Sequence, residues 1–86
     1  MKKITVYTTT ANCPYCVSAK QLLKSKNLSF EEITIDPDDE QAWNAMIARS
    51  RMKTVPQIYF GNDLIGGYTD LAALNQSGDL LKRLEN

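Results

Sequence analysis

Alternation of apolar and polar residues predicts two strands in the first half of the chain. Residues 3–8 place Ile4 and Val6 between polar or amphipathic neighbours, as in a half-buried strand. Residues 28–35 predict a second strand, but its apolar phase slips across Glu31 and Glu32. A bulge or an edge position in a sheet would explain that slip.

A hairpin is predicted in the second half. Residues 57–60 are strongly strand-forming, residues 61–63 have turn chemistry, and Leu64 and Ile65 form a short returning strand. The double glycine at Gly66 and Gly67 ends the hairpin, either as a simple turn or as a place where a ligand lies close to the backbone.

The segments between these strands show the apolar periodicity of helices. A first helix begins at Pro14 and ends near Asn27, which suits a left-handed cap. Its apolar positions are Tyr15, Cys16, Ala19, Leu22 and Leu23. A second helix is predicted from an Asp36 N-cap with Pro37 at the first helical position. Its buried stripe is Trp43, Met46 and Ile47.

The C-terminal part predicts a third helix and a short fourth one. Thr69 and Asp70 cap the third helix, which ends at Gly78. Its apolar positions are Leu71 and Leu74. Asp79 then opens a final turn or two, with apolar residues Leu80, Leu81 and Leu84.

The order of these elements predicts an α/β fold with a mixed four-stranded sheet, βαβα followed by ββα, and helices on both faces. The first two strands should be parallel through a right-handed crossover, and the hairpin should complete the sheet. The first strand is then central. Its C-terminal end delivers the chain to Cys13.

Size and charge narrow the possible partners. Eighty-six residues fit one domain over positions 1–86, with a small single core. Ten basic and ten acidic side chains cancel, so no global field favours nucleic acid or a membrane surface. Threonines interrupt the apolar residues of the basic first segment before a signal-peptide core forms. We expect a cytoplasmic protein that acts as a monomer.

The two cysteines of the chain lie three positions apart, in Cys13-Pro14-Tyr15-Cys16. Pro14 fits the first position of a helix, so Cys13 lies at the helix mouth, where free amides and the helix dipole favour a thiolate. The three-residue spacing puts both sulfurs on one helix face, where a disulfide can close and reopen.

Structural explanations of the pair are weaker. A disulfide over three residues restricts the unfolded chain little. A zinc site normally needs four ligands, and the chain has no histidine and no third cysteine. The acidic run at residues 36–40 is explained by helix capping more simply than by cation binding. A redox dithiol is therefore the favoured interpretation.

Three motifs in order, Cys13-Pro14-Tyr15-Cys16, Thr54-Val55-Pro56 and Gly66-Gly67-Tyr68-Thr69-Asp70, resemble a dithiol glutaredoxin of the CPYC type, within the thioredoxin-like superfamily. The resemblance spans nearly the whole chain. It implies a thioredoxin-like fold, glutathione as reducing co-substrate with no metal, and reduction of protein disulfides and glutathione mixed disulfides.

The resemblance also implies roles for individual residues. Cys13 would be the nucleophile and Cys16 the resolving thiol. The backbone of Val55, before a cis Pro56, would pair with the cysteinyl part of glutathione like an added strand. The implied glutathione-binding residues are Tyr15, Lys53, Thr54, Val55, Pro56, Gly67, Tyr68, Thr69 and Asp70. Among them, Thr69 and Asp70 would hold the γ-glutamyl end. Lys53 would face the other carboxylate.

Two positions depart from the family pattern. Thr10 stands where a lysine is common, in a connection one residue longer than usual, so the helix amides must do more to stabilise the Cys13 thiolate. Tyr68 stands where a cysteine is frequent.

Other functions remain open at this level. A redoxin reduced by thioredoxin reductase is disfavoured by Thr69-Asp70, and an iron–sulfur carrier by the rigid Pro14-Tyr15. The protein substrate stays open, with ribonucleotide reductase as one candidate.

Overall fold

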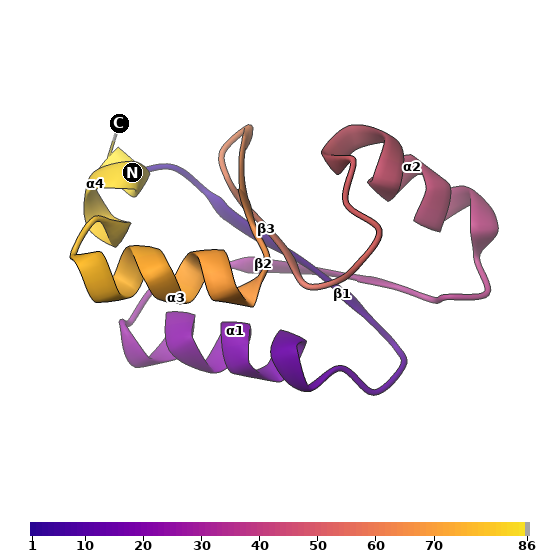
Figure 1. Cartoon of the computed structure of the whole chain (residues 1–86), viewed down its shortest axis with the longest axis horizontal. Helices are drawn as coiled ribbons and strands as arrows, with labels where there is room; N and C mark the ends of the chain where they lie inside the picture. Colours follow the sequence, from indigo (N-terminus) through magenta and orange to yellow (C-terminus); the bar gives the residue numbers. More distant parts are fainter. Residues whose placement is uncertain (86) are drawn as a thin grey trace.

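The computed structural model describes residues 1–85. Within them the elements are β1 (Ile4–Thr9), α1 (Pro14–Ser25), β2 (Glu31–Ile35), α2 (Glu40–Ser50), β3 (Gln57–Phe60), β4 (Asp63–Gly66), α3 (Tyr68–Ser77) and α4 (Leu80–Glu85). The predicted order of strands and helices is therefore confirmed (Figure 1).

The strands form one mixed sheet in the order β2-β1-β3-β4. β1 is parallel to β2 and antiparallel to β3, and β3 is antiparallel to β4. The central position of β1 is thus confirmed. β2 lies at the sheet edge, which accounts for the exposed Glu31 and Glu32. The irregularity in register lies instead between β3 and β4, at Ile58 and Tyr59.

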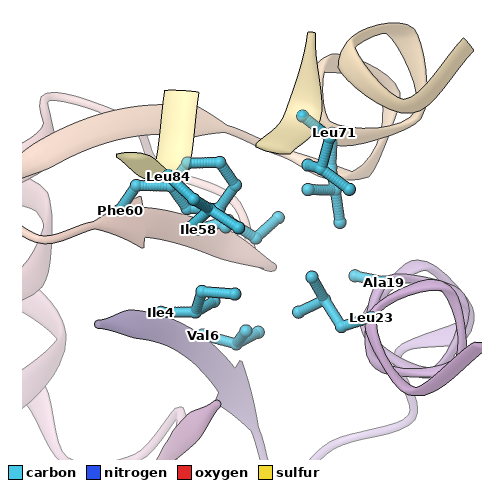
Figure 2. Packing of buried hydrophobic residues seen from close by; sticks show 9 residues of the cluster. Ile4, Val6, Ala19, Leu23, Ile58, Phe60, Leu71 and Leu84 are labelled. Carbon is cyan, nitrogen blue, oxygen red and sulfur yellow. The ribbon is translucent and has the colours of Figure 1, made fainter. Parts of the chain in front are cut away.

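The main core lies between the sheet and the helices α1, α3 and α4 (Figure 2). β1 directs Ile4 and Val6 to this side because side chains alternate between the faces of a strand. The other buried residues of the cluster are Ala19, Leu23, Ile58, Phe60, Leu71, Leu80 and Leu84. The backbone N–H of Lys2 donates to the carbonyl of Leu84 at 2.7 Å, which ties the start of the chain to α4.

α2 lies against the opposite face of the sheet. Arg49 of α2 donates from Nη1 to the Tyr7 hydroxyl at 3.0 Å, and its guanidinium lies 4.1 Å from the centre of the Tyr59 ring. The expectation of helices on both faces is confirmed. Of the predicted stripe, only Met46 is buried, whereas Trp43 and Ile47 are half-buried. None of the helices within residues 1–85 combines the length and the apolar composition that a membrane-spanning helix requires.

The predicted end of α1 is correct, but the predicted start of the second strand is too early. Asn27 adopts a left-handed φ of 58°. Its N–H donates to Lys24 O, and the next N–H, of Leu28, donates to Leu23 O at 3.0 Å, which is the Schellman pattern. Leu28 therefore closes the helix, and β2 begins only at Glu31.

The predicted start of α2 is wrong by three residues. Asp36 is the first residue of a turn, because its Oδ1 accepts the N–H of Asp38 at 2.9 Å and its carbonyl accepts the N–H of Asp39. Asp39 is the N-cap, with Oδ1 accepting the N–H of Ala42 at 3.1 Å. Several aspartates in this segment could each cap a helix. The first of them, Asp36, forms the turn, so a later one caps α2.

In contrast to α2, α3 begins slightly earlier than predicted. Its N-cap is Gly67, so Thr69 and Asp70 lie inside its first turn. The Asp70 carboxylate nevertheless caps the helix from within, by accepting the Gly67 N–H at 3.1 Å. The predicted stop at Gly78 is confirmed, with a left-handed φ of 83°.

Candidate functional site

The cysteine pair lies at the N-terminus of α1, directly after the loop that follows β1. Cys13 is the N-cap and Pro14 is the first helical residue, as predicted. The two cysteines form a disulfide, with their Cα atoms 5.3 Å apart. The backbone N–H of Cys16 donates to Cys13 Sγ at 3.2 Å, so the sulfur takes the place that a hydroxyl oxygen has in an ordinary N-cap.

The two sulfurs differ in their access to solvent. Cys13 is half-buried, whereas Cys16 is 2% exposed. An incoming thiol or disulfide can therefore reach Cys13 but not Cys16. This asymmetry follows from the helix, because Cys13 caps its N-terminus and Cys16 lies one turn further in.

A groove of about 330 Å³ lies beside the pair. It is lined by Tyr15, Thr54, Val55, Pro56, Gly67, Tyr68 and Thr69. These residues come from the start of α1, the loop before β3 and the start of α3. Figure 1 shows α1 and α3 side by side and running in the same direction, so that their N-termini lie next to each other. The rings of Tyr15 and Tyr68 stack at 6.1 Å between centroids and so join the two helix starts.

The loop before β3 brings its backbone to the cysteines. The Val55–Pro56 peptide bond is cis, as the family resemblance implied. The Val55 carbonyl oxygen lies 3.8 Å from Cys13 Sγ. Within residues 1–85 the Val55 N–H has no hydrogen-bond acceptor, because β3 begins only at Gln57. An extended peptide in the groove could therefore pair with Val55.

The N-terminus of α3 forms another wall of the site. Within the described chain, the N–H groups of Thr69 and Asp70 donate to no acceptor, and such groups at a helix start bind carboxylates well. Gly66 has φ 122°, and a Cβ there would collide with the Asp70 carboxylate. Gly66 is thus needed both for its backbone conformation and for the room that it leaves beside Asp70.

Seven of the nine residues predicted to bind glutathione line the groove. Lys53 and Asp70 do not. Lys53 is exposed on the loop, and Asp70 is exposed with one carboxylate oxygen on the Gly67 N–H. Thr10 is also exposed. In the described chain, the hydrogen-bond donor to Cys13 Sγ is a backbone amide and not a lysine or arginine side chain.

The charged groups with shifted pKa values lie elsewhere. The pKa of Glu32 is lowered by its hydrogen bonds to Lys20, at 2.9 Å, and to the buried Thr8 hydroxyl, at 2.8 Å. The hydrogen bond from Lys2 lowers the pKa of Asp63. Across residues 1–85, no three His, Cys, Asp or Glu side chains come together in a way that could hold a metal ion.

Sequence reasoning missed two residues that shape the groove, Gln57 and Ser50. Both are buried polar residues whose side chains bind the loop before β3. Gln57 was assigned only to a strand, and Ser50 lies in a helix, so neither showed a signal. Burial of a polar side chain next to a functional loop is visible only in the folded structure.

Together, the fold and the site define a thiol–disulfide exchange protein with a peptide-sized groove beside its dithiol. Comparison with known proteins gives the family. The Glutaredoxin family model matches residues 4–65. The chain is 46% identical over 83 residues to glutaredoxin 1 of Rickettsia typhi, covering 95% of this chain and 79% of that protein.

Two further comparisons agree. A glutaredoxin of Pseudomonas aeruginosa is 46% identical over 81 residues, which is 93% of each chain. The solution structure of reduced glutaredoxin C1 from Populus tremula x tremuloides superposes with a TM-score of 0.84 at 27% identity, covering 98% of this chain and 73% of that one.

The chain belongs to the glutaredoxin family and has its thioredoxin-like fold. Members of this family are thiol–disulfide oxidoreductases that use glutathione as co-substrate. The activity of the chain is therefore glutathione-dependent thiol–disulfide exchange, as the resemblance implied.

Proposed function

We propose that Cys13 is the attacking thiol and Cys16 the resolving thiol of this exchange. The observation that carries the proposal is the difference in access, since Cys13 is half-buried at the groove and Cys16 is 2% exposed. The Cys16 N–H at 3.2 Å from Cys13 Sγ and the helix dipole both stabilise negative charge on that sulfur.

With a glutathione mixed disulfide, one sulfur is enough. The Cys13 thiolate attacks the glutathionyl sulfur, a disulfide forms between Cys13 and glutathione, and the substrate leaves as a thiolate that takes up a proton. A second glutathione then attacks the glutathionyl sulfur. Oxidised glutathione leaves and the Cys13 thiolate returns.

With a protein disulfide, both sulfurs are needed. Attack by Cys13 joins it to the protein and frees one protein thiol. Cys16 then attacks Cys13 Sγ, the second protein thiol leaves, and the Cys13–Cys16 disulfide forms, the state present in this structure. Two glutathione molecules reduce that disulfide. Cys16 is fast in this role because the helix holds it beside Cys13 at high effective concentration.

Glutathione itself would lie in the groove. The N–H and C=O of Val55 would pair with its cysteinyl part, and the free amides at the start of α3 would bind its γ-glutamyl carboxylate. Tyr15 and Tyr68 would form one wall. Asp70 would face the ammonium and Lys53 the glycyl carboxylate, although neither side chain lines the groove in this structure.

We also propose that the chain is a single domain that acts as a monomer. We place it in the cytoplasm, because a lone, accessible dithiol suits a reducing compartment. Its substrates would be glutathionylated proteins and exposed protein disulfides. Ribonucleotide reductase is one candidate among the latter.

Two single substitutions test the roles of the sulfurs. Cys13→Ser should abolish both activities. Cys16→Ser should keep or raise the activity on small glutathione mixed disulfides, because the internal disulfide can no longer form, and should lose most activity on protein disulfides. Residual turnover of Cys13→Ser above a few per cent would mean that Cys13 is not the attacking sulfur. A parallel loss of both activities in Cys16→Ser would refute the separate roles.

A further inference from the structure

The loop at residues 51–56 joins α2 to β3 and supplies Thr54, Val55 and Pro56 to the groove. Its backbone is joined to α2 through the Arg51 N–H, which donates to Ile47 O at 2.6 Å. Beyond Arg51, the described chain has no backbone-to-backbone hydrogen bond from Met52 to Pro56. Side chains must therefore determine the path of the part that faces the cysteines.

Gln57, the first residue of β3, is the main side chain that binds this loop. It is 0% exposed, and its Nε2 lies 3.0 Å from the carbonyl oxygen of Met52 and 3.0 Å from that of Thr54. A primary amide nitrogen has two N–H groups, and Gln57 uses both on this loop. It thereby fixes two carbonyls of the loop, one on each side of Lys53.

Ser50 supports the same loop from the end of α2. The Met52 N–H donates to Ser50 Oγ at 3.0 Å, and that hydroxyl donates to Met46 O at 3.1 Å. Ser50 is 8% exposed. Both polar groups of the Met52 backbone are thus held by buried side chains, one from α2 and one from β3.

The other end of the Gln57 amide has no partner, because its buried Oε1 lacks a hydrogen bond within residues 1–85. Turning the amide over would place this acceptor against two carbonyl oxygens and would lose both donors, so its orientation is fixed. An unpaired buried acceptor destabilises the fold. An apolar side chain of similar length would avoid that cost, and it is the two donors that distinguish glutamine from such a residue.

The bond to Thr54 has a direct consequence for the groove. The Thr54 carbonyl and the Val55 N–H belong to one planar peptide unit, which is trans, since Val55–Pro56 is the cis bond of the described chain. In a trans unit the C=O and N–H point in opposite directions. A carbonyl held inward by Gln57 therefore turns the Val55 N–H outward, away from the core.

We propose that Gln57 is a positioning residue for glutathione, acting through the Thr54–Val55 peptide unit and not by contact with the ligand. The proposal rests on the assignment of the groove to glutathione. It predicts that loss of the two donors weakens glutathione binding while leaving the reactivity of the Cys13–Cys16 pair unchanged.

The test is Gln57→Met, which keeps the length of the side chain and removes both donors. The KM for glutathione should rise about tenfold, the factor that 1.4 kcal/mol produces. Single-turnover reduction of a protein disulfide by the pre-reduced variant, without glutathione, should keep its wild-type rate. Relaxation of the Val55 backbone amide, measured by NMR without ligand, should show an order parameter below about 0.6 instead of the rigid value of about 0.85.

Two further variants control for stability. Ser50→Ala removes the acceptor of the Met52 N–H and should raise the KM in the same direction but by less. Leu84→Ala in α4 removes a fully buried side chain far along the chain from the loop, so it should lower the melting temperature without changing the KM.

The outcomes are distinct. A wild-type KM with a rigid Val55 in Gln57→Met overturns the proposal, as does a fall of the single-turnover rate together with glutathione use, in proportion to the loss of stability. If the wild-type protein itself shows no saturable dependence on glutathione, the assignment of the groove is wrong and the positioning of glutathione falls with it. The Val55 relaxation of the two proteins then still decides whether Gln57 orders the loop.

Discussion

Asp70 offers a test in which two roles of one carboxylate can be separated. It accepts the Gly67 N–H at 3.1 Å and so caps α3. The family resemblance assigns it a second role, as counter-charge for the γ-glutamyl ammonium of glutathione. Asp70→Ala removes both, whereas Asp70→Asn keeps an oxygen acceptor for the Gly67 N–H and removes only the charge.

The expected magnitudes differ between the two variants. Loss of a cap destabilises a protein by about 1 kcal/mol, which lowers the melting temperature of a domain of this size by about 4–8 °C. Asp70→Ala should show this loss. Asp70→Asn should lose less, because only the favourable interaction with the helix dipole, about 0.3–1 kcal/mol, is removed. Both variants should raise the KM for glutathione by about tenfold, equivalent to about 1.4 kcal/mol.

Thermal unfolding and steady-state kinetics at several glutathione concentrations decide between the roles. Thr69→Ser, a change that leaves the carboxylate in place, serves as a neighbouring control. If Asp70→Asn keeps the wild-type KM, the carboxylate acts only as a helix cap. Because Asp70 does not line the groove in this structure, that outcome is a real test of the family assignment.

Two other predictions concern charge. Thr10→Lys should place an ammonium near Cys13 and raise its thiolate fraction at neutral pH by up to about fivefold, since a charge pair at about 4 Å in water gains about 1 kcal/mol. Alkylation rates of the reduced protein against pH would show this as a midpoint at lower pH, and an unchanged midpoint would contradict it. The hydrogen bonds that lower the pKa of Glu32 stabilise the folded protein at pH values above 4.5, the ordinary pKa of this carboxyl group. The stabilisation is lost as the pH falls through the lower pKa that Glu32 has in the folded state. Melting temperature should therefore fall more steeply below pH 4.5 in the wild-type protein than in Glu32→Gln, and parallel curves would show that Glu32 does not contribute.

Elements controlled by local residues were predictable from the sequence. Pro14 fixes the start of α1, and the left-handed positions at Asn27 and Gly78 end two helices where expected. In each case one residue has a conformational preference that its neighbours do not oppose. The start of α2 could not be decided in this way, because Asp36 and Asp39 are both good caps and the choice depends on the turn between them.

The candidate site was predictable in part. The spacing of Cys13 and Cys16, with Pro14 at the first helical position, indicated a dithiol at a helix start, as the structure has it. The groove was predicted only from the family resemblance, because it forms where the loop before β3 packs against the start of α3 in the folded chain. The two segments are so close that a Cβ at Gly67 would lie 3.6 Å from the Pro56 carbonyl oxygen. Gln57 could not be found, since its partners become its neighbours only when the loop has folded.

Several groups at the candidate site within residues 1–85 are backbone groups: the Cys16 N–H on Cys13 Sγ, the unpaired N–H of Val55, and the free amides at the start of α3. Backbone groups cannot be exchanged by substitution, so their directions depend on the residues that fix the chain behind them. Gly66 does this by its positive φ, and Gln57 by its two hydrogen bonds. Because peptide dipoles carry no net charge, salt should screen this recognition less than it screens the contributions of Lys53 and Asp70. The glutathione affinity that remains at high ionic strength should therefore come mainly from these backbone groups, whose directions Gly66 and Gln57 fix.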